Sequence, residues 1–307
     1  MRLSLRGANL AEWLVLRAGI VPTAAAEAWG GMALSAVLIA AVRTGMTTRL
    51  AQQPSTAADL AADLGLDPVP TRLLLDCLRS AGHVTFRAGR YELSRSSRRW
   101  LDPESGLSVA QFVAGTSDYW AWWSALDEVT RSGQPAGHHE APPGDPYWRR
   151  YICGQLEFAR LSADEVARKL RLPGDPRSLL DIGGGHGWYS AQLCPHYPRL
   201  TATVLDLPGS AAIGREIIAG AGMADRVEHR DGDATTDDLG SGYDAVLCFN
   251  LVHHLTSDPT VDLFGRIHDS LAPGGLLAVM DPFAQPSRRM AADLNLFGLF
   301  VYLSSGS

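Results

Sequence analysis

Residues 180–187 read Leu-Asp-Ile-Gly-Gly-Gly-His-Gly and follow an apolar run. A dinucleotide-binding turn requires the spacing G-x-G-x-x-G, in which the third glycine allows a helix to pack closely on a strand. Gly183 and Gly185 fit the first two positions, but Trp188 occupies the third. Asp181 opens the loop, and a carboxylate there would repel a pyrophosphate. The stretch therefore predicts a turn that binds a ligand carrying an ammonium group or other donors.

Two further acids end the next predicted strands. Asp206 closes the run Val-Leu-Asp at 204–206, at a distance from the glycine loop where a carboxylate can accept both hydroxyls of a ribose. Asp233, in the stretch 230–234, ends the third run, where a carboxylate can accept an adenine amino group. A ligand with a ribose, an adenine, an ammonium group and no phosphate is S-adenosylmethionine (SAM).

In combination, these three motifs resemble those of class I SAM-dependent methyltransferases. More narrowly, the chain is similar to small-molecule O-methyltransferases of plants and bacterial polyketide pathways, from about residue 28 to its end. The resemblance implies that Gly183, Gly185, Asp206 and Asp233 contact the cofactor. We assign Asp181 and Gly187 to the same cofactor loop. The role of Asp181 stays open, because its carboxylate could also shape the turn by accepting backbone N–H bonds.

The fourth predicted strand, 245–249, runs into Asn-Leu-Val-His-His-Leu at 250–255. Ligands in open α/β sheets bind beyond the carboxyl ends of parallel strands. In the resembled O-methyltransferases this segment reads Leu-His-Asp-Trp and its histidine is the general base, a role that falls on His253 here. Histidine suits proton transfer near neutral pH. Other class I methyltransferases carry a similar stretch without a base, so a structural role for His253 also stays open, and we expect His254 to be structural.

The pattern from residue 173 to 307 predicts a Rossmann-like, doubly wound α/β domain that binds SAM. Its apolar runs are 178–182, 200–205, 227–230, 245–249 and 276–280. Class I folds normally continue with a further helix and a final pair of strands, so we expect this domain to be C-terminally short, with the final strands missing. Truncation, completion by a second chain and loss of methyl transfer would each explain this. The apolar run 290–303 is expected to be covered by N-terminal helices or another chain.

The preceding residues divide into a mainly α-helical, winged-helix-like domain, 1–105, and a helical linker, 106–172. Two helices and a short hairpin at 84–93 are typical of a winged helix, which could bind DNA or another protein. The second helix offers only Arg72 and Arg79, which favours a protein interface, and the resemblance implies dimerisation. The linker is rich in aromatic residues, and we expect it to contribute to the substrate pocket.

Composition narrows the choice of partners. The 307 residues carry a net charge of -6, which argues against nucleic acid, because phosphate binding draws on clustered Lys and Arg. Four cysteines without a CxxC pair indicate a reduced, cytoplasmic protein. The apolar run 33–42 is too short to span a bilayer, so no membrane partner is expected. His138, His139 and Glu140 lack a further ligand at a suitable spacing, so no metal site is expected.

These features predict a dimeric, SAM-dependent O-methyltransferase that acts on a small aromatic secondary metabolite. Two alternatives use the same scaffold. One is a non-catalytic or partner-completed protein, which the short C-terminus favours. The other is a family member repurposed as a hydroxylase or decarboxylase, which His254 and Leu255 in place of Asp-Trp would suit. A DNA-binding regulator is a more distant alternative.

Overall fold

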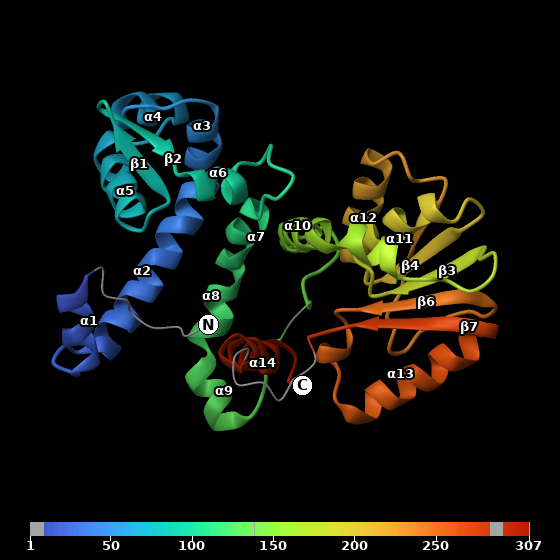
Figure 1. Cartoon of the computed structure of the whole chain (residues 1–307). Coiled ribbons are helices and arrows are strands. Elements are labelled where there is room, and N and C mark those ends of the chain that lie inside the picture. Colours follow the sequence, from blue (N-terminus) through green and yellow to red (C-terminus); the bar gives the residue numbers. More distant parts are fainter. Residues whose placement is uncertain (1–8, 138, 283–290, 307) are drawn as a thin grey trace. The chain divides into compact units, whose positions relative to one another are not determined.

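The computed structural model describes residues 9–137, 139–282 and 291–306 (Figure 1). The chain forms two compact units, and the main boundary between them follows Ser117. The first unit is helical, apart from one hairpin, and the second contains the larger sheet.

The first unit contains the helices and the hairpin that the sequence predicts. Thr56 accepts a hydrogen bond from the backbone N–H of Asp59 and begins the fourth helix, which ends at the left-handed Gly65. Ala88 and Gly89, both with positive φ, form the hairpin turn. In order, the elements are α1 (Leu10–Arg17), α2 (Thr23–Arg43), α3 (Met46–Gln52), α4 (Ala57–Leu64), α5 (Pro68–Ser80), β1 (Val84–Arg87), β2 (Arg90–Leu93), α6 (Arg95–Leu101) and α7 (Ala110–Gly115).

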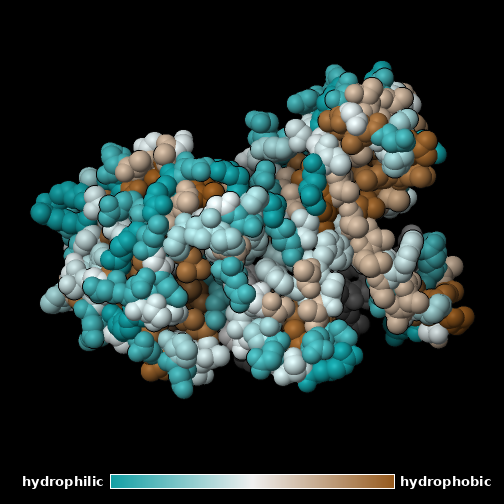
Figure 2. Space-filling model, turned by 180° about the vertical axis from the view of Figure 1, so that it is seen from behind, coloured by the Kyte–Doolittle hydropathy of each residue, from teal (hydrophilic) through white to brown (hydrophobic). Residues whose placement is uncertain are grey.

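Helix α2 is apolar over nearly its whole length, and little of it is buried in the single chain. Trp29 is 72% exposed and Met32 57% exposed, and hydrophobic colours follow the N-terminal helices in Figure 2. By length and composition alone, α2 could cross a membrane, although core helices and signal sequences also meet that criterion.

The second unit starts with short helices and one long helix. These are the 3₁₀ helix η1 (Thr116–Tyr119), which straddles the division, then α8 (Trp120–Ser124), α9 (Leu126–Ser132) and α10 (Pro146–Lys169). The Asp145 side chain caps α10 by accepting the N–H of Tyr147, and Pro146 occupies its first turn, where its missing N–H costs nothing.

A parallel sheet follows, with strand order β5-β4-β3-β6-β7. The elements are β3 (Ser178–Ile182), α11 (Trp188–Leu193), η2 (Cys194–His196), β4 (Thr201–Asp206), α12 (Pro208–Gly220), β5 (Val227–Asp231), β6 (Tyr243–Phe249), η3 (Val252–His254), α13 (Ser257–Ser270), β7 (Leu271–Met280) and α14 (Ala291–Ser305). The strand order reverses beside β3, so the loops after β3 and β6 diverge and open a crevice at the carboxyl ends. This confirms the predicted Rossmann-like fold.

Alternate residues of the strands pack into two cores, one on each face of the sheet. Leu179 belongs to the core that α10, α11 and α12 cover, whereas Leu180 belongs to the core that α13 covers. Because both faces are buried, the strands are continuous apolar runs, which is why the sequence located them well. Asp181 lies on the central strand, between Val204 and Leu247 on its two neighbours.

Within the described residues, this sheet has five strands and α14 follows it. One face of α14 is covered inside the second unit. Phe300 packs against Tyr119, Trp122 and Trp123, with ring centroids 4.9 to 6.1 Å apart. The carbonyl of Leu303 accepts the N–H of Ala136 at 2.8 Å. Helix α8 and the loop after α9 thus cover this face, while Leu296, Leu299 and Tyr302 stay exposed.

Candidate active site

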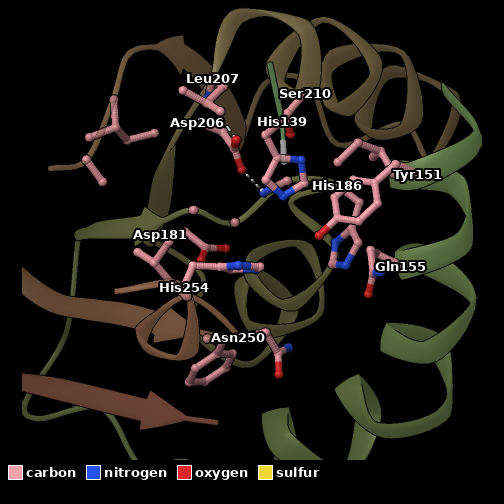
Figure 3. A pocket seen from close by; sticks show the side chains of 18 of the residues that line it. His139, Tyr151, Gln155, Asp181, His186, Asp206, Leu207, Ser210, Asn250 and His254 are labelled. Atoms are coloured by element: carbon pink, nitrogen blue, oxygen red, sulfur yellow. Dashed lines mark hydrogen bonds between the residues drawn. The ribbon is translucent and has the colours of Figure 1, made fainter. Parts of the chain in front are cut away.

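A cavity of about 270 Å³ lies at the carboxyl ends of β3, β4, β5 and β6 (Figure 3). Side chains of α10 form its opposite wall. Five of the seven residues that the sequence singled out line this cavity: Asp181, Gly183, Gly185, Asp206 and Asp233. Gly187 and His253 are not among the lining residues. The sheet topology therefore brings together three acids that lie far apart along the chain.

The glycine loop has a conformation that other residues would strain. Gly183 and Gly185 have φ of 64° and 50°, in the left-handed region. Gly184 is required for a different reason, since a Cβ there would come within 2.5 Å of the Asp181 carboxyl carbon. Gly187, with φ of 66°, begins α11 and packs against His229 and Ile218. Three consecutive glycines thus form a backbone cradle, and Gly187 fixes the helix behind it.

Asp181 is buried under this cradle. Its carboxylate accepts a hydrogen bond from the Ser190 hydroxyl at 2.7 Å. Burial raises the pKa of Asp181 to about 7, and the nearby Asp206 carboxylate acts in the same direction. A cationic group in the cavity would favour the ionised form of this acid.

Asp206 holds the glycine loop in place. Its two carboxylate oxygens accept the N–H groups of Gly185 and Leu207, each at 2.7 Å. Burial raises the pKa of Asp206 to about 6, although these two bonds lower it. Each oxygen has a second lone pair that can accept a ligand hydroxyl. The hydroxyl of Ser210 is buried, also lines the cavity and lies beside the Asp206 carboxylate, whose pKa it lowers as well.

Asp233 lines the cavity from the loop after β5. Its Oδ1 accepts both the N–H and the hydroxyl of Thr235, at 2.8 and 2.6 Å. Its own N–H donates to Asp237 at 2.9 Å. These bonds hold the loop that faces the cavity beside Ala234.

His253 lies beside the cavity, in η3. Its Nδ1 donates to Oδ1 of Asp281 at 2.9 Å, and the other oxygen of Asp281 accepts the N–H of Val252 at 3.0 Å. The side chain of Asp281 is only 4% exposed. This bond places the proton of a neutral imidazole on Nδ1, so Nε2 is left as the basic nitrogen. The Phe297 ring meets the His253 ring edge-on, 5.1 Å between centroids.

The sequence did not indicate Asp281 as the partner of His253. The available signal was that β6 and β7 are neighbours, so the residues after them meet at one edge of the sheet.

Aromatic rings from the linker form another part of the cavity. The sequence alone did not indicate which linker residues would face it. His139 stacks on Trp148 with centroids 5.5 Å apart and meets Tyr151 edge-on at 4.6 Å. His254 lies 5.6 Å from His139 and lines the cavity as well. The Trp148 indole donates to the carbonyl of Ala141 at 3.0 Å, which secures the loop that carries His139.

The described residues contain no group of three or more His, Cys, Asp or Glu that could hold a metal ion. His138 of the sequence His-His-Glu lies outside the described residues. His139 instead shares a hydrogen bond of 3.0 Å with the hydroxyl of Tyr147.

Comparison with known proteins gives a consistent result. A family model described as an O-methyltransferase domain matches residues 139–306. The 3-hydroxy-5-methyl-1-naphthoate 3-O-methyltransferase of Streptomyces sahachiroi is 27% identical over 288 residues, covering 91% of this chain and 82% of that protein. The 8-amino-8-demethylriboflavin N,N-dimethyltransferase of Streptomyces davaonensis is 30% identical over 264 residues, covering 80% and 74%.

Solved structures agree with the fold. The mitomycin 7-O-methyltransferase has a TM-score of 0.80 at 25% identity, covering 96% of this chain and 88% of that one. Human N-acetylserotonin methyltransferase, solved in complex with SAM, has a TM-score of 0.80 at 20% identity and covers 98% and 88%.

Proposed function

The chain belongs to the O-methyltransferase family, and on this premise we propose that it methylates a hydroxyl group of a small, planar aromatic secondary metabolite. It is a SAM-dependent enzyme. The observation that carries the proposal is one cavity at the strand-order reversal, lined by Asp181, Asp206 and Asp233, with the pair His253–Asp281 beside it.

The residues present fit SAM. We assign the ribose hydroxyls to Asp206 and the neighbouring hydroxyl of Ser210, and the adenine amino group to Asp233. The cradle 183–185 and Asp181 suit the cationic methionine end. His186 also lines the cavity, and burial lowers its pKa to about 3, so it stays neutral and does not repel a cation. When bound, SAM supplies the electrophilic methyl group and departs as a neutral thioether.

His253 is the proposed base. Its Nε2 would take the proton of the acceptor hydroxyl as the oxygen becomes nucleophilic, and Asp281 would stabilise the imidazolium that results. A positioned base contributes about 10²–10⁴ in rate, and alignment of the acceptor oxygen contributes up to roughly 7–11 kcal/mol. His254 lines the cavity directly and is assigned a role in shaping it.

The aromatic lining supports a planar acceptor. Tyr151, Trp148, Phe158 and His139 give the cavity flat apolar walls on the α10 side. Rings of this kind prefer offset-stacked or edge-to-face contacts with other rings. Relatives named for a hydroxynaphthoate and for mitomycin act on ring systems, which is consistent with this chemistry.

The acceptor class can be tested with a panel of hydroxynaphthoates, hydroxyquinones and aliphatic alcohols, incubated with SAM carrying a trideuterated methyl group. We expect a mass gain of one labelled methyl on phenolic members alone. An aminoarene panel is the matched control, because one relative is an N,N-dimethyltransferase. Labelling of arylamines but not phenols would refute the hydroxyl assignment.

Cofactor binding is expected to release protons near pH 6.5. The pKa values of Asp181 and Asp206 are raised to about 7 and about 6, so both carboxyls are partly protonated there. A cationic ligand with hydroxyl donors binds the ionised forms more tightly, lowers both pKa values and expels protons. Calorimetric titration of SAM in two buffers with different ionisation enthalpies should give different heats. The Asp181→Asn variant should release fewer protons, and equal heats in both buffers would count against the proposal.

We also propose that the protein is a cytoplasmic homodimer joined through its N-terminal domain. The apolar surface of α1 and α2 supports this, since Leu10, Leu14, Trp29 and Met32 are all exposed in the single chain. Burying such a surface against a second copy stabilises the dimer by roughly 25 cal/mol for each Å² of apolar area removed from water.

The variant Trp29→Glu should shift the protein from dimer to monomer, because it places a charge within the proposed interface. Light scattering after gel filtration would measure this. Val261→Glu is the matched control, since Val261 on α13 is equally exposed, at 72%, but lies outside the proposed interface. An unchanged mass for Trp29→Glu would exclude this part of α2 from the interface.

A further inference from the structure

The imidazole of His229 lies directly behind the glycine loop. His229 is on the edge strand β5, opposite Val204 of β4. Its Nε2 lies 2.9 Å from the carbonyl oxygen of Gly185. A carbonyl only accepts, so Nε2 carries the proton and donates it. Its Nδ1 is buried and has no hydrogen-bond partner in the described part of the chain, so the neutral tautomer is the one that fits.

Two glycines leave the space for this ring. A Cβ on Gly214 of α12 would overlap both Nε2 of His229 and the carbonyl oxygen of Gly185. A Cβ on Gly187 would come within 3.1 Å of Cε1 of the same imidazole. By contrast, Gly220 on the same helix has nothing within 4 Å of such an atom. Gly214 therefore leaves room for the contact between His229 and the loop, which a side chain at this position would block.

Gly185 is consequently held on both sides. Its N–H donates to Asp206, at 2.7 Å, and its carbonyl accepts from His229. The two bonds come from neighbouring strands and act on one residue whose φ of 50° is unfavourable for most side chains. Such a residue keeps its conformation only when its surroundings determine it.

We propose that His229 is a positioning residue for the cofactor, which fixes the carbonyl of Gly185 and thereby holds the glycine loop and Asp206 ready for SAM. His229 does not line the cavity, so it acts through Gly185. The inference rests on the proposed cofactor site. It predicts that loss of this donor weakens SAM binding, whereas turnover at saturating SAM changes little.

The test compares four variants by calorimetric titration of SAM and by steady-state kinetics. His229→Leu removes the donor and should weaken SAM binding about tenfold, with a matching rise in KM for SAM and a kcat within about twofold. His229→Gln keeps an N–H donor at a similar reach and should bind SAM within about threefold of the unmodified protein. Gly214→Ala keeps the histidine but places a methyl group against both its Nε2 and the carbonyl oxygen of Gly185, so it disrupts the same contact and should also weaken SAM binding. Gly220→Ala should leave SAM affinity unchanged.

Asp206→Ala serves as the reference that separates two kinds of failure. If Asp206→Ala loses SAM while His229→Leu and Gly214→Ala keep it, the role of His229 is wrong and the cofactor site stands. If all three bind SAM normally, the cofactor site itself is wrong. Equal loss for His229→Gln and His229→Leu would show that the donor is not what matters. If His229→Leu does not fold by circular dichroism, Gly214→Ala and His229→Gln decide the outcome in the same way.

Discussion

Asp206→Ala is expected to weaken SAM binding at least about a hundredfold, the largest effect on affinity of any single change considered. Charge-assisted hydrogen bonds contribute about 1.5–3 kcal/mol each, and Asp206 is assigned the ribose hydroxyls. The substitution also leaves the N–H groups of Gly185 and Leu207 without their acceptor, so the loop itself loosens. Calorimetric titration of SAM measures the loss.

The control for this variant is Asp262→Ala, which removes an exposed carboxylate from α13 and leaves the cavity intact. Because it changes the net charge by the same amount, it separates the loss of the Asp206 contacts from a general effect of removing a negative charge. Unchanged affinity in Asp206→Ala, with the fold retained, would refute the assignment of the ribose site.

His253→Ala should lower kcat by about 10²–10⁴ with a phenolic acceptor, while the Kd for SAM stays close to that of the unmodified protein. The reason is that His253 lies beside the cavity, held by Asp281, but does not line it. Single-turnover rates measured with saturating SAM would isolate the chemical step.

Two further variants test whether the effect comes from His253 and its bond to Asp281. Asp281→Ala should reduce kcat by a smaller factor, because the histidine remains but loses its orientation and the stabilisation of its charged form. His268→Ala, an exposed histidine on α13, should have no effect. Full turnover in both His253→Ala and Asp281→Ala would show that another group accepts the proton, or that the acceptor reacts already ionised.

The strands of the sheet could be predicted closely from the sequence. They are buried on both faces, so each is a short apolar run, and the predicted run 178–182 coincides with β3. The glycine loop could also be predicted, because positive φ at Gly183 and Gly185 leaves few alternatives to glycine. Asp206 and Asp233 follow from the rule that ligands bind at the carboxyl ends of parallel strands.

Other parts depend on contacts that are distant in the sequence. Asp281 meets His253 only because β6 and β7 are neighbours, and His229 meets Gly185 only because α12 lacks a side chain at Gly214. Helix α2 begins at Thr23, ten residues before the apolar run 33–42, because an alanine-rich apolar segment has no polar face to mark its start. The separate helix α3 arises from the left-handed Gly45 between the two.

Titration of SAM into the full chain by calorimetry, at a concentration where its oligomeric state is known, tests the central claim most directly. We expect one SAM to bind per chain with a Kd of about 1–100 µM, in the usual range for enzyme substrates. Absence of binding by a protein that is folded by circular dichroism would contradict it, since the cavity and its three acids would then not form a cofactor site.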